Sequence, residues 1–428
     1  MRLRLIFSLF TALALLLSFV HPAVAQGPSG RPLRVTVPKS SEELPGDIGQ
    51  RAHTNILILG NGPIQPAGQL SPQSGGPPFP GYFYETPASL ACIYRLVHPA
   101  GNGCNPNVVD TNPNGGGRAI AIVDAYDDPA AVSDLAQFSA QFGLPPANFQ
   151  VVFAAGTNPG PDPTGGWELE ESLDIEYAHA MAPNAQLFLV EAASNSFSDL
   201  VNAELVAASL VAEAGGGEVS NSWGGSEFPQ EVQLDFLFTQ PGVVYFASTG
   251  DSPGTSWPSI SPNVVAAGGT STNRNPNTGS FLYEGSWPWG GGGPSQYEPR
   301  PSYQNGIAYI AGSARVVPDI SADANPITGV WVLDSTPTGG EGGPGAWWIV
   351  GGTSVSSPVL AGIVNAAGRF HRSSAKELSE IYSNSRGGFS QGFNDIQADN
   401  CGPYGGYLAQ PGYDFCSGVG SPNGYSNK

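Results

Sequence analysis

A serine that follows two glycines is the strongest candidate nucleophile in the chain. Ser354 lies in the stretch WWIVGGTSVSSPVLAG, which is predicted to run from a strand through a tight turn into a helix. Gly351 and Gly352 allow the backbone to bend and to approach a substrate closely. Pro358 is tolerated only in a first helical turn, so the helix should begin within a few residues of Ser354. N–H groups at a helix start favour developing negative charge, but a serine there is equally typical of an ordinary helix cap.

A serine nucleophile needs a general base, and histidine is the usual partner. The chain has five histidines. Four of them lie in the N-terminal leader, in an N-terminal arm, beside a cysteine or at a helix end: His21, His53, His98 and His371. This leaves His179, in LDIEYAHAMAP, or a base that is not a histidine.

Two carboxylates one helical turn apart offer another base. Glu170 and Asp174 are four residues apart in WELEESLDIEYAHAMAP, so on a helix both side chains project from one face. Adjacent carboxylates resist double ionisation, which raises one pKa and lets the pair share a proton. Such a pair can accept the Ser354 proton and return it to a leaving amine. The alternative is a solvated acidic helix face. Three further glutamates would belong to that face: Glu168, Glu171 and Glu176.

Two aspartates end apolar runs that are predicted to be strands. Asp251, in FASTGDSPG, has a sequence typical of an Asx-turn at a strand end. Asp124, in AIVDAY, stands where a Ser-His-Asp subtilisin carries its aspartate, and without a suitable histidine we interpret it as structural. His179 follows Asp174 on the same helix but on another face, which favours a packing role. A neutral peptidase that uses His179 with Asp124 is the alternative.

Strands and helices alternate along most of the chain. Continuous apolar runs predict strands at residues 118–126, 185–193, 242–252, 263–271 and 346–354. Helical patterns occur at residues 127–143, 196–215 and 356–371. Apolar strands that alternate with helices indicate an α/β fold, with a doubly wound, mostly parallel sheet and helices on both faces. The Gly/Pro/Ser-rich stretch 287–344 is expected to form loops.

The overall composition excludes some functions. The 428 residues include 58 Gly and 40 Pro, and 35 acidic against 16 basic residues give a net charge of −19. Such a surface repels phosphate backbones and anionic lipids, so nucleic acid and membranes are not expected partners. Carboxylates lose their charge as the pH falls, and the composition therefore favours work in acid.

The N-terminus predicts export. Residues 1–25 combine arginines, an apolar run and the small residues AVA, the pattern of a cleaved signal peptide rather than of a membrane span. Residues 26–81 are rich in Pro, Gly, Ser and Gln, so we expect an extended arm with one strand, in TNILILG. Residues 82–428 then form one α/β domain.

Four cysteines form two local pairs. An even number of cysteines in an exported protein indicates disulfides. Their spacing favours Cys92–Cys104 and Cys401–Cys416 among three possible connectivities. A metal site is the weaker alternative, because the sequence has no CxxC motif.

Eight segments occur in order between about Tyr84 and Asn423: AIVDAYDDP, GWELEESLDIEYAHAMAP, SNSWGG, ASTGDS, VVAAGGTS, VPDISADANPITG, GGTSVSSP and FNDI…PGYDFCSGVGSP. Together they resemble the sedolisins, the serine-carboxyl peptidases, which have a subtilisin-like fold and a glutamate in place of the histidine. The resemblance implies that residues 82–428 form a peptidase domain.

The resemblance also implies the roles of individual residues. Ser354 would be the nucleophile, Glu170 the base and Asp174 the carboxylate that orients it, with Glu171 the main competitor for the register. Asp251 would be the acid of the oxyanion hole. A carboxylate there would repel the oxyanion, whereas a protonated acid donates a hydrogen bond to it, so activity should need low pH.

The C-terminal segment FNDIQADNCGPYGGYLAQPGYDFCSGVGSP resembles the sedolisin calcium site. Carried over by position, the ligands of one structural Ca²⁺ are the side chains of Asp395 and Asp414 and the carbonyls of Ile396, Gln410 and Gly412. Hard oxygen ligands of this kind suit Ca²⁺. A disulfide-closed loop without metal is the alternative.

The resemblance predicts a secreted or periplasmic endopeptidase that acts on proteins or peptides at acid pH, as a monomer. Trp223, in SNSWGG, is expected to shape the substrate cleft. The chain departs from the family in one respect, because only about 55 residues separate the signal peptide from Tyr82, too few for a large pro-domain. An exported binding or adhesion protein on an inactive peptidase scaffold is the alternative from another class.

Overall fold

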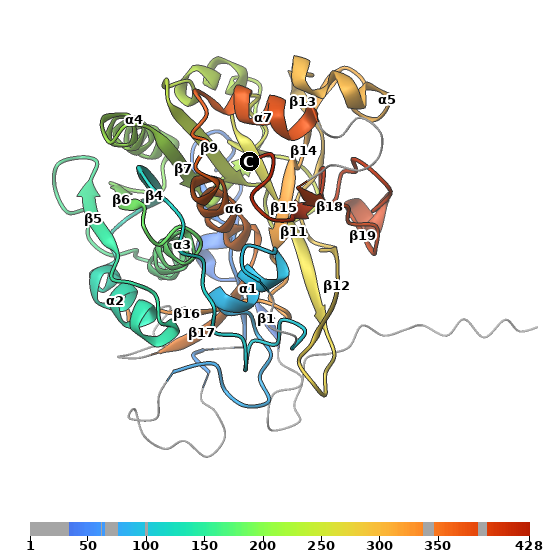
Figure 1. Ribbon diagram of the computed structural model, residues 1–428. Helices are drawn as coiled ribbons and strands as arrows, with labels where there is room; N and C mark the ends of the chain where they lie inside the picture. Colours follow the sequence, from blue (N-terminus) through green and yellow to red (C-terminus); the bar gives the residue numbers. More distant parts are fainter. Residues whose placement is uncertain (1–33, 61, 65–75, 99–101, 337–345, 384–391) are drawn as a thin grey trace, which may run out of the picture.

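A mostly parallel sheet runs through the middle of the molecule (Figure 1). The computed structural model describes residues 34–60, 62–64, 76–98, 102–336, 346–383 and 392–428. Seven strands follow the order β12-β11-β9-β7-β4-β6-β5, and β15 also pairs with β11. All pairings are parallel except that of β11 with β12. The strands are β4 (Ala119–Ala125), β5 (Asn148–Phe153), β6 (Gln186–Ala192), β7 (Gly217–Asn221), β9 (Val243–Ser248), β11 (Val265–Arg274), β12 (Phe281–Ser286) and β15 (Ile320–Asp323).

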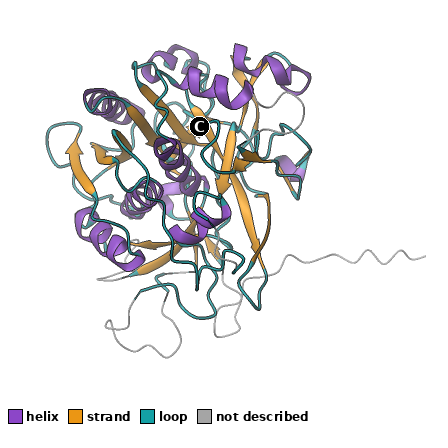
Figure 2. Cartoon of the chain, in the orientation of Figure 1, coloured by secondary structure: helices purple, strands orange, loops and turns teal. Residues whose placement is uncertain are grey.

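Helices cover both faces of this sheet (Figure 2). In β4, Ile120 and Ile122 pack with residues of α2 and α3, whereas Ala121 and Val123 pack with residues of α4. This alternation confirms the doubly wound α/β fold. The helices are α1 (Pro87–Ile93), α2 (Ala131–Phe142), α3 (Trp167–Met181), α4 (Phe197–Glu213), α5 (Ala308–Ala311), α6 (Thr353–Ala367) and α7 (Ser374–Ser383).

The strand before Ser354 does not belong to the parallel sheet. β17 (Trp347–Gly351) lies in a separate sheet of order β1-β3-β17-β16, in which every pairing is antiparallel. Its other strands are β1 (Val35–Thr36), β3 (Leu57–Leu59) and β16 (Val330–Leu333). The expectation of a fifth parallel strand is wrong here, because a short buried apolar run has the same pattern in both kinds of sheet.

The N-terminal segment is more ordered than the expected arm with one strand. It contains β1, β2 (His53–Thr54) and β3, and Ala52, Ile56 and Leu59 are fully buried. β2 pairs with β8 (Trp223–Ser226), which also pairs with β10 (Ser256–Trp257). Strands this short show no period of their own, and their partners lie far along the chain. The predicted signal peptide, residues 1–25, lies outside the described residues.

The stretch 287–344 contains strands where we expect loops. Besides β15 and β16 it holds α5 and an antiparallel pair, β13 (Gly293–Pro299) and β14 (Ala314–Val317). β14 is anchored by the buried ion pair of Arg315 with Asp319, whose Nη2 and Oδ2 are 2.6 Å apart. Four short strands follow near the C-terminus: β18 (Phe393–Asn394), β19 (Asn400–Cys401), β20 (Tyr407–Leu408) and β21 (Ser421–Pro422).

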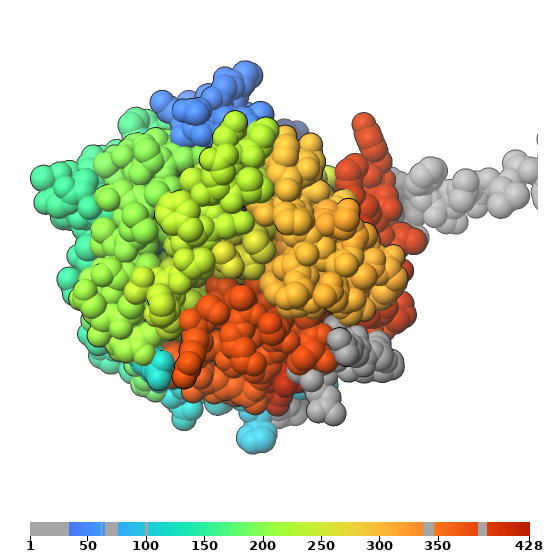
Figure 3. Space-filling view, turned by 90° about the horizontal axis from the view of Figure 1, so that it is seen from above, coloured from blue at the N-terminus to red at the C-terminus, as the bar shows by residue number. Residues whose placement is uncertain are grey.

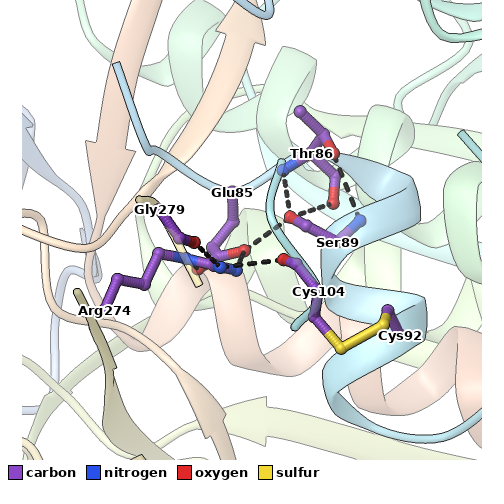
Figure 4. Close-up of a disulfide and its surroundings, with 7 residues drawn as sticks. All are labelled: Glu85, Thr86, Ser89, Cys92, Cys104, Arg274 and Gly279. Atoms are coloured by element: carbon purple, nitrogen blue, oxygen red, sulfur yellow. Dashed lines mark hydrogen bonds and ion pairs between the residues drawn. A yellow bond between two sulfur atoms is a disulfide. The ribbon is translucent and has the colours of Figure 1, made fainter. Parts of the chain in front are cut away.

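Two disulfides, Cys92–Cys104 and Cys401–Cys416, confirm the predicted pairing. Figure 4 shows the first of them beside a buried ion pair. Arg274 Nε donates to Glu85 Oε1 over 2.7 Å, and Arg274 Nη1 donates to the Cys104 carbonyl over 2.8 Å. Because Glu85 directly precedes the cap of α1 and is fully buried, the pair ties β11 to this helix.

Replacing Arg274 by alanine is expected to lower the free energy of unfolding by about 3–5 kcal/mol, because the Glu85 carboxylate is left buried without its cation. Arg369→Ala is the control, since the Arg369 side chain is 48% exposed in its pair with Glu380. The Arg369→Ala variant should lose less than about 1 kcal/mol in its free energy of unfolding. Urea unfolding at neutral pH gives both values, and equal small losses would contradict the role of the buried pair.

The protein should become less stable as the pH rises. Burial raises the pKa of Glu204 and of Glu218 to about 8 and that of Glu284 to about 7. In an unfolded chain such groups titrate near about 4.3, so between these values the folded state binds more protons. The stability that these protonated carboxyl groups give to the folded state is fully present below about pH 4 and is lost as the pH rises toward 8. We expect the Tm measured by calorimetry to fall between about pH 5 and pH 8. A constant or rising Tm would contradict the buried, protonated state of these groups.

Candidate active site

A tight turn places Ser354 at the start of α6. Gly352 has a φ of +105°, and a Cβ there would lie 2.0 Å from the carbonyl oxygen of Asn55, so only glycine fits. The helix begins one residue before Ser354, within the predicted few residues, but Pro358 lies beyond its first turn and not in it as expected. Because proline has no N–H, the Ser354 carbonyl lacks its helical donor, and Ser222 Oγ lies 3.3 Å from it.

Ser354 lies against Glu170 of α3. Its Oγ donates to Oε2 of Glu170 over 2.9 Å, and both side chains are fully buried. α3 and α6 approach closely at Gly362, where a Cβ would lie 2.6 Å from the Cβ of Met181. This glycine therefore permits the packing that brings the two side chains together. The hydrogen bond joins the serine to Glu170 and not to its neighbour Glu171.

Asp174 lies one turn further along α3. Ser222 Oγ donates to its Oδ1 over 2.8 Å. Burial raises the pKa of Glu170 and of Asp174 well above their usual values, and the charges of Asp174 and Asp124 raise that of Glu170 further. Glu170 Oε1 and Asp174 Oδ2 have no hydrogen-bond partner among the described residues. Because the charge of one carboxyl disfavours ionisation of the other, the buried pair resists double ionisation and can hold a proton between them.

α3 has no solvated acidic face, because every one of its residues is buried. Glu168 accepts the N–H of Asp162 over 2.8 Å, and Glu176 accepts that of Leu333 over 3.2 Å. Burial raises the pKa of Glu171 well above its usual value. The alternative reading of these glutamates as surface residues is therefore wrong, and the helix carries buried acids along its whole length.

Asp124, which the sequence analysis interpreted as a structural residue at a strand end, also belongs to this buried group. It lies in β4, directly opposite Glu191 of β6, and is fully buried. Burial and then the charge of Asp174 raise its pKa well above the usual value. Among the described residues, neither of its carboxyl oxygens has a hydrogen-bond partner. Its position near the carboxyl end of a parallel strand was the available signal, since sites gather at that edge of α/β sheets.

Asp251 contacts the first residue of α6. Its Oδ1 accepts the N–H and the hydroxyl of Thr353 over 2.7 and 3.0 Å, while its Oδ2 has no partner in the described part of the chain. Burial raises its pKa to about 7. A Cβ on Gly352 would lie 2.4 Å from this Oδ2 and 2.0 Å from the Asn55 carbonyl oxygen. Both oxygens thus crowd one position, where a protonated Asp251 can donate to a bound carbonyl.

His179 and Trp223 lie away from this chemistry. Nε2 of His179 is 2.9 Å from the Pro145 carbonyl, and burial lowers its pKa, as is typical of a packing residue. Trp223 is fully buried and donates to the Val123 carbonyl over 2.9 Å, so it does not shape the cleft as expected. The glycines that follow Trp223 instead line a cavity of about 760 Å³ that also borders Asp251.

The two predicted calcium carboxylates accept backbone N–H groups within the C-terminal loop. Oδ1 of Asp395 accepts the N–H of Gly412 over 3.1 Å, and Oδ2 of Asp414 accepts that of Gln410 over 3.0 Å. Ile396 follows Asp395 and is buried. In the described ranges, no three His, Cys, Asp or Glu side chains are grouped to hold a metal ion. The loop offers two carboxylates, so further ligands would have to be carbonyls.

The fold is that of the subtilisin-like serine peptidases. The structure titled Pseudomonas sedolisin (serine-carboxyl proteinase) complexed with two molecules of pseudo-iodotyrostatin matches with a TM-score of 0.62 at 24% identity. The match covers 79% of this chain and 95% of that one. At 24% identity this structural match establishes the fold alone. The relationship to a family rests on the similarity of the sequences.

Kumamolisin from Bacillus sp. (strain MN-32) is 30% identical over 357 residues, 73% of this chain and 59% of kumamolisin. Sedolisin from Pseudomonas sp. (strain 101) is 24% identical over 355 residues, 74% of this chain and 58% of sedolisin. Tripeptidyl-peptidase 1 from Homo sapiens is 25% identical over 337 residues, 68% of this chain and 56% of that protein. No family model matches the chain. The chain is homologous to these sedolisin-family proteins over about 70% of its own length, and it spans less than two thirds of theirs.

Proposed function

We propose that the chain is a serine-carboxyl endopeptidase that hydrolyses peptide bonds of proteins or peptides at acid pH, as a monomer. The 2.9 Å hydrogen bond from Ser354 Oγ to Glu170 Oε2 is the observation that carries this proposal. It gives a buried serine a carboxylate base in place of a histidine. The homology to sedolisin-family proteins supports the same chemistry.

The reaction has two halves, acylation and deacylation. Each half uses four side chains: Ser354, Glu170, Asp174 and Asp251. Glu170 takes the proton of Ser354 as Oγ attacks the scissile carbonyl, and Asp174 shares the charge of the pair. The N–H of Ser354 and the protonated Asp251 stabilise the oxyanion. Glu170 then returns its proton to the leaving amine, which leaves an acyl-enzyme on Ser354. Water then attacks the ester carbonyl and gives a proton to Glu170. Ser354 recovers its proton as the carboxylic acid product is released.

Hydrolysis of an unfolded protein, followed as new amino groups across the pH range, tests this proposal. We expect a maximum in acid, and we expect the His179→Gln variant to keep the wild-type rate because His179 only packs. A maximum near neutrality that depends on His179 would support the Ser-His-Asp alternative instead.

We also propose that the protein is exported, on the basis of the leader-like residues 1–25. Residues 26–81 would then serve as a short pro-segment in front of the peptidase domain at 82–428. In the part of the chain that the structure describes, no helix is both long and apolar enough to cross a membrane.

We also propose a structural calcium ion in the C-terminal loop. Asp414 is 1% exposed, and within the described residues neither it nor Asp395 forms an ion pair with a basic side chain. Burial raises the pKa of Asp414 to about 6, which a bound cation would reverse. We propose that these two side chains, with the carbonyls of Ile396, Gln410 and Gly412, hold the ion. Bound there, it would supply the positive charge that the loop lacks.

Removal of calcium should therefore lower the Tm of the wild type by several degrees, because an ion at 100 times its Kd contributes about 2.7 kcal/mol to stability. Asp414→Asn should lower the Tm in calcium and abolish the response to a chelator. Asp110→Asn, on an exposed loop, should keep the wild-type response. A wild-type Tm that does not change when a chelator is added would contradict the proposed calcium site.

A further inference from the structure

Ser222 closes a ring of contacts around the nucleophile. This residue directly precedes β8, and its carbonyl oxygen lies 3.0 Å from Oγ of Ser354, which is also 2.9 Å from Oε2 of Glu170. One turn further along α3, Oδ1 of Asp174 accepts the hydroxyl of Ser222 over 2.8 Å. The ring therefore runs from Ser354 through the two carboxyl groups to Ser222 and back to Ser354.

This ring is shielded from solvent, because the side chains of its four residues are fully buried. β2 of the N-terminal segment pairs with β8, and in Figure 3 this segment, in blue, lies at the surface beside the yellow-green part of the chain that contains β8. Just after β2, the N–H of Asn55 donates to the Ser222 carbonyl over 3.2 Å, and the Asn55 carbonyl accepts the N–H of Ser354 over 3.1 Å. Away from bulk water, the hydrogen bonds of the ring decide where its charge and its protons lie.

The hydroxyl of Ser222 has one hydrogen and two acceptors within reach. Oδ1 of Asp174 is 2.8 Å from its Oγ, and the Ser354 carbonyl oxygen is 3.3 Å away. The shorter contact is with a group that can be charged, and a hydrogen bond to a charged oxygen is roughly twice as strong as a neutral one. The hydrogen of Ser222 therefore points at Asp174 and marks Oδ1 as an accepting oxygen.

This bond influences where the buried pair keeps its proton. Glu170 Oε1 and Asp174 Oδ2 have no hydrogen-bond partner among the described residues. With Oδ1 engaged by Ser222, a proton held by the pair is favoured on these two oxygens. Oε2 of Glu170, which faces Ser354, then stays free to accept the proton of the nucleophile.

The hydrogen bond from Ser222 also opposes the other influences on the pair. Burial raises the pKa of both carboxyl groups, and the charges of Asp174, of Asp124 in β4 and of Asp251 after β9 raise the pKa of Glu170 further. The Ser222 hydroxyl favours the charged form of Asp174 and so lowers its pKa. It is thus a donor that keeps a negative charge on the pair where the surrounding acids disfavour one.

Given the peptidase function proposed above, we infer that Ser222 is a positioning residue, whose hydroxyl holds a single negative charge on Glu170 and Asp174 in acid and thereby sets the acid limit of activity. When Ser354 Oγ attacks the substrate carbonyl, its proton passes to Oε2 of Glu170 and the pair becomes neutral. When Glu170 gives this proton to the leaving amine, the bond from Ser222 to Asp174 again favours the singly charged pair. A pair that solvent has already protonated leaves Ser354 without a base.

The test is to measure kcat/KM for a peptide substrate from about pH 2 to about pH 8. We expect the acid limb of the Ser222→Ala profile to move to higher pH by about one to two units, because the charged pair loses a hydrogen-bond donor. On the acid limb the variant is then about 10- to 100-fold slower, whereas the alkaline limb stays where the wild type has it. Ser220→Ala is the matched control, since it removes a nearby buried hydroxyl that bonds to Ser357 Oγ at 2.8 Å, and it should keep both limbs.

A second variant covers the case in which Ser222→Ala does not fold. Ser222→Cys nearly keeps the size of the side chain, but a thiol is a weak donor, so its acid limb should move in the same direction by a smaller amount. An unmoved acid limb in the variant that folds, even with a lower rate at every pH, would overturn the inference and leave the proposed function standing. A wild-type chain that hydrolyses no peptide in acid would overturn both proposals.

Discussion

The alanine variant of Ser354 and the glutamine variant of Glu170 should each lose about 10⁴- to 10⁶-fold in kcat at the acid optimum. The first removes the atom that forms the acyl bond. The second keeps the size of the side chain and a hydrogen bond to Ser354, but an amide cannot take the proton. Because the two groups act as one unit, the double variant should be hardly slower than either single one.

Two neighbours serve as matched controls for these variants. Ser357→Ala lies on the same helix and removes one buried hydrogen bond, to Ser220 Oγ at 2.8 Å. That change should cost about 1 kcal/mol of stability and leave kcat within a few fold. Glu171→Gln is the control for the base, because it is adjacent and equally buried. Initial rates on an unfolded protein give kcat for all five variants. Loss of activity in Glu171→Gln with retention in Glu170→Gln would move the base to Glu171.

Asp251 should set the alkaline limit of activity. Burial raises its pKa to about 7, and only the protonated acid can donate a hydrogen bond to the oxyanion. That donor is present below this pH and is lost as the pH rises through it. Asp251→Ala should therefore lose about 10²- to 10³-fold in kcat, as other enzymes do when one oxyanion donor is removed.

Asp251→Asn provides the sharper test of this protonation. Its amide oxygen can still accept the N–H of Thr353, and its NH₂ group donates at every pH, so the alkaline limb that Asp251 causes should disappear from the pH–rate profile. Asp235→Asn changes a half-buried aspartate whose pKa is also raised by burial, and it should leave this limb unchanged. An identical alkaline limb in Asp251→Asn and in the wild type would show that Asp251 is not the titrating donor.

Much of the fold could be predicted from local pattern. β4, β6, β9 and β11 are apolar on both faces, which is the pattern of parallel strands between helix layers. β17 has the same pattern but lies in an antiparallel sheet, since a pattern of burial does not reveal the direction of a partner. β1, β2 and β3 are too short to show a period, and their contacts with residues after 220 exist only in the folded chain.

The candidate site, like the fold, could be predicted only in part from local sequence pattern. The spacing of Glu170 and Asp174 predicts that both lie on one helix face, but not that the whole helix is buried. That depends on the layers packed around α3 and changes the chemistry, because only a buried pair has a raised pKa. Asp124 could not be assigned from sequence, since its raised pKa depends on its burial in the folded sheet and on the charge of Asp174 in α3. The place of Asn55 at the nucleophile likewise requires the complete fold.

The acyl-enzyme is the intermediate that tests the central claim most directly. The protein can be mixed with an activated peptide ester at about pH 4, quenched within milliseconds by strong acid, digested and analysed by mass spectrometry. We predict that the acyl group is found on the peptide that contains Ser354, and that Glu170→Gln accumulates it far more slowly. Turnover of the ester without any acyl group on Ser354, or with the group on another residue, would contradict the account.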